Sequence, residues 1–156
     1  MSGNVALYNL ALTKFATQVS AMEETKPFFS GTPDVQVRKF DWDDIIKQSG
    51  VCIRYDRDEI KEGQGNIVTD FWGYPLYLVI VQEKQMQIDD EPQLLLSKIR
   101  NTYNHAQLLN VTSEGACNSA TVVLDGPAVP QDRRTSNEFR NKDIYTLTVM
   151  AWFDEQ

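Results

Sequence analysis

The sequence predicts an α+β domain: a mainly antiparallel sheet of about four strands, with two long helices and one short helix packed on one face. Two stretches repeat apolar residues at helical spacing, one near the N-terminus and one in the middle of the chain. Segments with strand patterning stand between and after them, and their connections are compatible with hairpins, which favours antiparallel pairing.

A length of 156 residues fits a single domain over residues 1–156, whose core needs no metal or disulfide. Hydrophobic residues make up 42% and charged residues 24%, an ordinary globular mixture that argues against wholesale disorder. The net charge is −7, whereas a conventional duplex-DNA binder needs a broad cationic face. We therefore expect an acidic protein that does not grip DNA.

The first helix is predicted over residues 4–24. Its apolar side chains recur at intervals of three and four positions, which places them on one helical face. These residues are Val5, Tyr8, Leu12, Phe15, Val19 and Met22. We expect this face to pack on the domain's own sheet, and a coiled-coil seam between chains is the alternative. Pro27, Gly31 and Pro33 then predict a loop.

Two short elements are predicted next. Val35 and Val37 alternate with polar neighbours, which indicates a short strand. A short helix is predicted over residues 42–48, because Asp41 can cap its start and Gly50 is a favourable stop.

Two strands are predicted at residues 51–55 and 73–82. The second has apolar residues on both faces in its middle, so we expect it to be central in the sheet. Pro75 has no amide hydrogen to donate, and is therefore expected at the start of this strand. The charged stretch 56–71 between the two strands predicts a long loop.

The second long helix is predicted over residues 91–104. Acidic residues and Pro92 at its start suit the first turn of a helix. Its apolar face is formed by Leu95, Ile99 and Tyr103, and widened by Leu94 and Leu96.

The chain closes with predicted strands at 121–124 and 144–153, separated by a long polar loop at about 125–143. Alternation in the last strand predicts that one face lies on the core. That face comprises Tyr145, Leu147, Val149, Ala151 and Phe153.

The residue types that carry catalysis or bind metals form no recognisable pattern. His105 is the only histidine, and a solvated or capping role is expected for it. Cys52 and Cys117 lack metal-site or redox spacing, and the acidic clusters lack the spacing of a calcium-binding loop. We therefore predict no catalytic residues, no cofactor and no metal, and we expect the chain not to be an enzyme.

Charge separates along the chain, which favours contacts between copies. Residues 56–91 hold nine acidic and three basic residues, whereas residues 132–143 hold four basic and three acidic ones. Opposed charges on two long loops suit head-to-tail contacts that close into a ring, and two solvated loops are the alternative. The candidate interface residues are Arg57, Asp58, Glu59, Phe71, Trp72, Arg133, Arg134, Phe139 and Arg140.

The order of these elements resembles a known family. The resemblance rests on the amphipathic N-terminal helix, Gly50-Val51-Cys52-Ile53, the strand at 73–81, the helix at 94–103 and the final strand at 145–153. In this pattern, over nearly the whole chain but without a diagnostic motif, the sequence is similar to the tail-terminator and related neck proteins of tailed bacteriophages.

The resemblance implies a structural virion protein that forms a ring, usually hexameric, at the head-proximal end of the tail. Such a ring ends polymerisation of the tail tube and joins the tail to the head. The implied partners are copies of the chain, the tail tube protein and the head connector or stopper protein, with DNA only passing through a channel. The implied location is the virion, after synthesis in the host cytoplasm.

No membrane association is expected, because the longest apolar run, residues 76–81, is too short to cross a bilayer. Two other readings stay open. One is another phage neck, head-completion or tail-tube-associated protein. The other is a small α+β enzyme or ligand-binding domain whose site has no linear motif.

Overall fold

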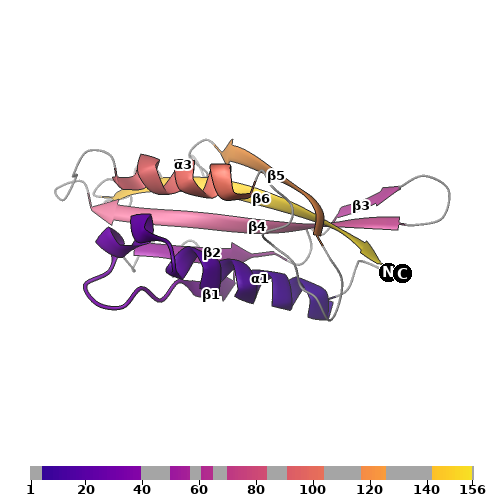
Figure 1. Cartoon of the computed structure of the whole chain (residues 1–156), viewed down its shortest axis with the longest axis horizontal. Helices are drawn as coiled ribbons and strands as arrows, with labels where there is room; N and C mark the ends of the chain where they lie inside the picture. Colours follow the sequence, from indigo (N-terminus) through magenta and orange to yellow (C-terminus); the bar gives the residue numbers. More distant parts are fainter. Residues whose placement is uncertain are drawn as a thin grey trace.

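The computed structural model describes residues 5–39, 50–56, 61–64, 70–83, 91–103, 117–125 and 142–155. Helices and a mixed sheet confirm the α+β class (Figure 1). The helical elements are α1 (Val5–Ser20), the 3₁₀ helix η1 (Glu23–Phe28) and α3 (Glu91–Tyr103). The strands are β1 (Gln36–Lys39), β2 (Gly50–Tyr55), β3 (Lys61–Gln64), β4 (Asp70–Glu83), β5 (Cys117–Asp125) and β6 (Lys142–Glu155).

The sheet is larger than the sequence predicts. Its six strands run in the order β1-β2-β4-β6-β5, and β3 pairs with β4 off this path. Only β1 and β2 are parallel, while every other described pair is antiparallel. The predicted four strands correspond to β2, β4, β5 and β6, and the predicted short strand at Val35 and Val37 corresponds to β1.

The two longest strands form the axis of the sheet. β4 and β6 pair along their whole lengths, from Asp70 opposite Glu155 to Glu83 opposite Lys142. The other edge of β4 is shared: β3 pairs with Asp70–Gly73 and β2 with Tyr77–Val81. As a result, the sheet continues past the ends of the helices through β3 and the adjoining ends of β4 and β6 (Figure 1). The start of β5 borders this part, because Cys117 and Ser119 pair with Phe153 and Trp152 of β6.

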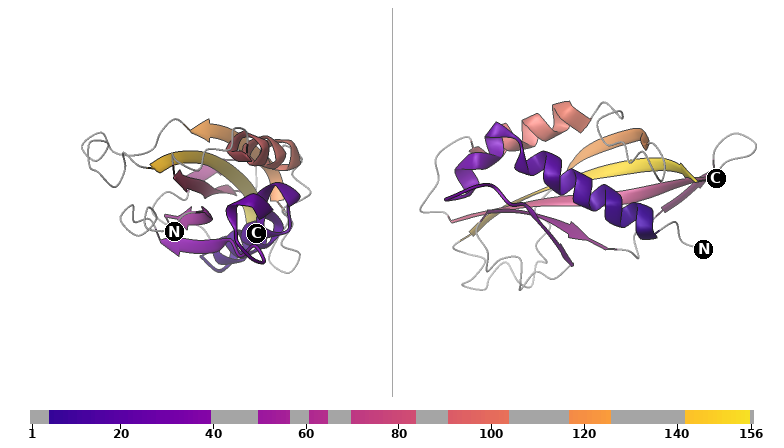
Figure 2. Two further views of the ribbon diagram at one scale, coloured as in Figure 1. Left: turned by 90° about the vertical axis from the view of Figure 1, so that its left-hand side faces the viewer. Right: turned by 60° about the horizontal axis from the view of Figure 1, so that its bottom comes forward.

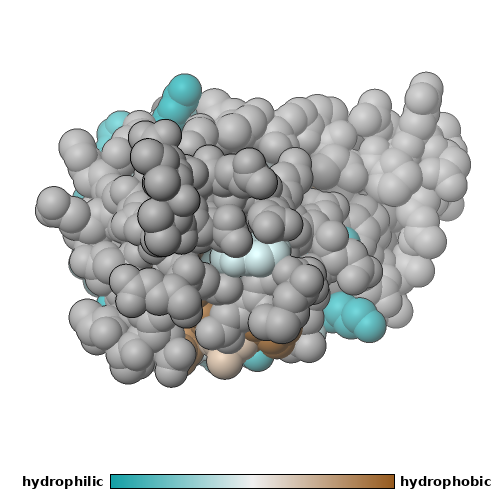
Figure 3. Space-filling view, turned by 90° about the vertical axis from the view of Figure 1, so that its right-hand side faces the viewer, coloured by the Kyte–Doolittle hydropathy of each residue, from teal (hydrophilic) through white to brown (hydrophobic). Residues whose placement is uncertain are grey.

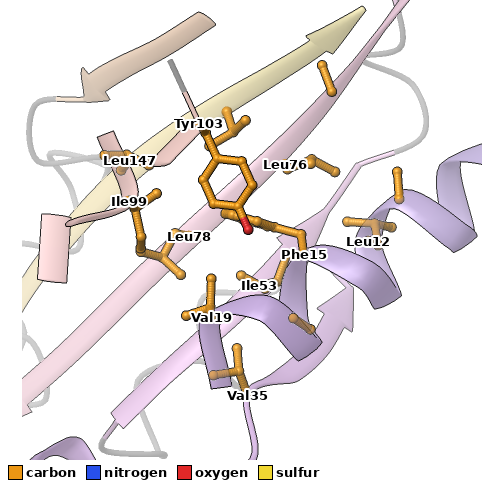
Figure 4. Packing of buried hydrophobic residues seen from close by; sticks show 14 of the residues in the cluster. Leu12, Phe15, Val19, Val35, Ile53, Leu76, Leu78, Ile99, Tyr103 and Leu147 are labelled. Carbon is orange, nitrogen blue, oxygen red and sulfur yellow. The ribbon is translucent and has the colours of Figure 1, made fainter. Parts of the chain in front are cut away.

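Helices α1 and α3 lie over the same face of the sheet (Figure 2). The predicted face of α1 is buried from Tyr8 to Val19, and Leu95, Ile99 and Tyr103 of α3 are fully buried. These side chains point toward Ile53, Leu76 and Leu78 of the sheet, which confirms packing on the domain's own sheet (Figure 4).

Two predicted core positions are wrong. Val5 is 42% exposed and Leu94 is 57% exposed, because each lies at the border of its apolar face. The predicted widening of the α3 face holds for Leu96, which is partly buried against the core.

The two helices are joined through Tyr103. Its ring meets the ring of Phe15 edge-on, with 5.0 Å between the centroids. The Tyr103 hydroxyl donates a hydrogen bond to Oε1 of Gln18, and burial raises the pKa of this hydroxyl above its ordinary value. The hydroxyl therefore stays protonated and remains a donor in the core.

The helix predicted over 4–24 ends earlier than expected, at Ser20. Thr25 Oγ1 donates to the carbonyl oxygen of Val19 at 2.7 Å, which satisfies a helix-end carbonyl. Ser20 Oγ donates to Ala16 and accepts the amide of Val35 at 3.0 Å. Thus two hydroxyl side chains end α1 and tie it to the residue before β1.

The hydroxyl of Tyr8 links β2 and β4 at a point where the two strands form no backbone hydrogen bond of their own. Tyr8 Oη donates to the carbonyl oxygen of Pro75 at 2.8 Å and accepts the amide of Asp56 at 3.3 Å. Continuing the β2–β4 register places Asp56 directly opposite Pro75, which has no amide hydrogen. The hydroxyl therefore bridges the two strands where their direct pairing stops.

This arrangement corrects the predicted position of Pro75, which lies inside β4 rather than at its start. Pro75 is tolerated because it lies in the interval between the segments of β4 that pair with β3 and with β2.

The predicted loop at 56–71 is also wrong in part, because it contains β3 and the start of β4. The ends of the predicted loop 125–143 belong to β5 and β6, and the rest of that loop lies outside the described residues. The predicted short helix at 42–48 lies outside them too.

Both faces of the sheet are buried at its centre, as the sequence predicts for β4. Val79 and Val81 are buried on the face away from α1 and α3. On β6 the predicted core face is confirmed, but Thr146 and Thr148 on its other face are buried as well. The centre of the sheet is therefore shielded on both sides.

We predict that Tyr8→Phe lowers the free energy of unfolding by about 1–3 kcal/mol, because it leaves the buried carbonyl of Pro75 without its donor. Chemical denaturation measures this change. Tyr145→Phe is the matched control: Tyr145 is partly buried, and its hydroxyl has no hydrogen-bond partner in the described part of the chain. Equal stability losses in the two variants would contradict a bridging role for Tyr8.

Candidate functional site

Few of the predicted interface residues can be placed. Phe71 and Trp72 lie at the start of β4, opposite Asp154 and Phe153 of β6. Trp72 is partly buried and packs against the core, so its ring contributes to folding. The others lie outside the described residues: Arg57, Asp58, Glu59, Arg133, Arg134, Phe139 and Arg140. His105 also lies outside them.

The sheet ends in an acidic extension, which we call the acidic tip. It consists of β3, residues Asp70–Gly73 of β4 and Trp152–Glu155 of β6. These segments contain four acidic positions, Glu62, Asp70, Asp154 and Glu155, and one basic position, Lys61, which gives a net charge of −3. The tip lies beyond the helices in two views (Figures 1 and 2).

Gly73 allows an aromatic side chain to cover the base of the acidic tip. A Cβ atom on Gly73 would lie 2.9 Å from ring carbons of Trp152 and 3.1 Å from Sδ of Met150. A Cβ contact as short as the one to the indole is essentially never seen, so the absence of a side chain on Gly73 is what lets the Trp152 ring lie across its strand partner.

A basic surface is formed by β1 and β2, which we call the basic edge. The parallel register places Arg38 beside Arg54, and Lys39 follows on β1. Neither strand contains an acidic residue, so their net charge is +3. Ile53, which precedes Arg54 on β2, is buried on the helix side. Because successive side chains of a strand point to opposite faces, Arg54 lies on the other face of the sheet. Arg38 is paired with Arg54 and therefore lies on that face too.

The two arginines differ in environment. Arg54 is 5% exposed, and its guanidinium lies 5.0 Å from the centre of the Tyr77 ring, a favourable cation–π distance. Arg38 is partly buried, and its Nε atom is buried without a hydrogen-bond acceptor among the described residues. No carboxylate in the described part of the chain forms an ion pair with Arg38.

Cys52 lies on the same face as the two arginines. Burial raises the pKa of its thiol to about 11, although the charges of Arg38 and Arg54 act in the opposite direction. The thiol is therefore protonated at neutral pH, which does not suit a nucleophile or a metal ligand.

Apolar surface is exposed on the side formed by α1 and β1. Val5 and Leu10 of α1 and Val37 of β1 are between 36% and 42% exposed. Figure 3, which looks onto the end that carries the acidic tip, shows apolar colour along this lower side. The apolar and basic surfaces thus share the β1 edge of the molecule.

Neither a metal site nor a membrane-spanning helix is found within the described residues. No group of three or more His, Cys, Asp or Glu side chains there is arranged to hold a metal ion. No described helix has the length and apolar content needed to cross a membrane.

Comparison with known protein families and with curated protein sequences finds no significant match to this chain.

Sequence reasoning missed the basic edge, although one signal for it exists. Arg38 and Arg54 each sit one position after an apolar strand residue, which indicates that both face away from the core. The sequence does not reveal that β1 and β2 pair in parallel, and only that register places the two arginines side by side.

We predict that Cys52 reacts with iodoacetamide about a hundredfold more slowly in the folded chain than in the denatured chain at pH 8. The raised pKa, about 11 against 9.0, leaves about a hundredfold less thiolate in the folded state. A Cys117→Ser background isolates the signal, and the folded rate should rise steadily toward pH 11. Equal folded and denatured rates would contradict the assigned burial.

Proposed function

We propose that this chain is a structural assembly protein that binds copies of itself in a ring, as the tail-terminator proteins of tailed bacteriophages do. The observation that carries the proposal is that two oppositely charged surfaces occupy different parts of one sheet. The acidic tip carries −3 and the basic edge carries +3.

This charge arrangement favours a head-to-tail contact. Two tips repel each other, as do two basic edges, so contact through either surface alone is unfavourable between identical copies. A contact of one tip with the next basic edge leaves a free tip and a free edge, which a further copy can occupy. If the rotation between neighbours closes, the product is a ring.

The element order also supports the proposal. The segments on which the family resemblance rests form α1, β2, β4, α3 and β6, the element types that the resemblance requires. We expect the short helix at 42–48 to join α1 and α3 on their face of the sheet.

In this proposal the ring, usually of six copies in this family, sits at the head-proximal end of a phage tail. It ends polymerisation of the tail tube protein and presents a second surface to the head connector or stopper protein. DNA passes through the ring without being gripped, because a chain of net charge −7 repels it. The arginines and acids at 57–59 and 133–140 would add contacts between copies.

Size measurement in solution tests this proposal. We expect light scattering to find an oligomer of about six times 17.8 kDa, with rings visible by electron microscopy. Added to growing tail tubes, such rings should cap one end and fix the tube length. A chain that remains at 17.8 kDa at high concentration, and that leaves tube length unchanged, would contradict the proposal.

A further inference from the structure

We propose that Arg38, on the basic edge of one copy, binds carboxylates from the acidic tip of the neighbouring copy. The inference rests on the proposed ring and names the contact that builds it. It assigns a binding site for acidic side chains to the β1 edge of the sheet, on the face opposite α1 and α3.

Arg38 has a buried guanidinium nitrogen that no acceptor in the described part of the chain satisfies. A buried guanidinium nitrogen without an acceptor carries the full cost of its lost hydration. Its strand, β1, ends the described strand order of the sheet, so an incoming segment can approach along that edge. A carboxylate that approaches the half-buried Arg38 side chain can take two parallel hydrogen bonds from its guanidinium.

Arg54 strengthens the attraction for an anion. Both arginines lower the pKa of Cys52, so both charges lie close to the same thiol. Like charges at paired positions on neighbouring strands are unfavourable, and an anion beside them offsets that repulsion. The Arg54 guanidinium lies over the ring of Tyr77, and this cation–π contact keeps the charge in place.

The acidic tip is the part of the molecule that can supply the anion only to another copy. β4 pairs with β6 at every position from Asp70 to Glu83, so the tip cannot turn back toward β1 without breaking this ladder. Its segments place four acidic positions and one basic position on adjacent strands, so a cationic partner offsets the net negative charge of the tip.

Cross-linking of an Arg38→Lys chain tests the contact directly. A zero-length carbodiimide reagent joins an amine to a carboxylate that touches it, and this substitution puts an amine at the proposed site itself. In a mixture of isotope-labelled and unlabelled chains, we expect mixed-label peptides that link position 38 to Glu62, Asp70, Asp154 or Glu155. Oligomers that give mixed-label cross-links elsewhere but none at position 38 would overturn the inference.

Charge reversal provides the second test. Arg38→Glu should weaken self-association by about tenfold or more, measured by sedimentation velocity. Lys26→Glu is the matched control, because Lys26 is exposed and its one ion pair within the described part of the chain is with Glu23 in η1. Reversing the tip as well, with Asp154→Arg and Glu155→Arg, should restore association to the Arg38→Glu chain.

The outcomes separate the contact from the ring. If the wild-type chain forms rings but Arg38→Glu associates normally, the contact is wrong and the ring stands. If Arg38→Glu weakens association and the reversed tip does not restore it, Arg38 acts within its own copy and the contact is wrong. A wild-type chain that is monomeric at every concentration overturns both.

Discussion

The antiparallel ladder between β4 and β6 is the constraint on which the rest of the structure depends. It joins two strands of 14 residues each, and every other strand except β1 pairs directly with one of them. Helices α1 and α3 cover only part of its length (Figure 1). Because the ladder is longer than the helical layer, part of the sheet must project, and the acidic tip is that part.

The boundary between the covered sheet and the tip is built from aromatic residues. Tyr8 and Tyr74 lie 5.5 Å apart, and Tyr74 meets Phe153 edge-on at 5.4 Å, so three rings close the end of the core. At the same place the Tyr8 hydroxyl substitutes for pairing between Asp56 and Pro75. The core thus closes around these rings, and the tip beyond is held by backbone pairing, by the packing of Trp72 against the core and by Trp152 across Gly73.

Periodicity predicted the elements and most of the core, because residues such as Phe15, Ile99 and Leu147 are buried by the face on which they lie. It could not predict where that face ends, so Val5 and Leu94 were assigned to the core. Proline was expected only at the start of the strand because an interior strand position normally has a hydrogen-bonded neighbour on each side. At Pro75, however, β4 lies between its paired segments with β3 and β2, so neither strand pairs with it there. The basic edge depends on register between β1 and β2, which local patterns do not carry.

The central claim is that the acidic tip is completed by the next copy in an assembly. Hydrogen exchange of backbone amides, measured in dilute and concentrated samples, tests it most directly. Within Asp70–Gly73 and Trp152–Glu155, we expect protection to rise as copies associate, while Leu76–Val81 in the covered part of β4 stays equally protected. Tip protection that is the same in monomers and assemblies would contradict the claim.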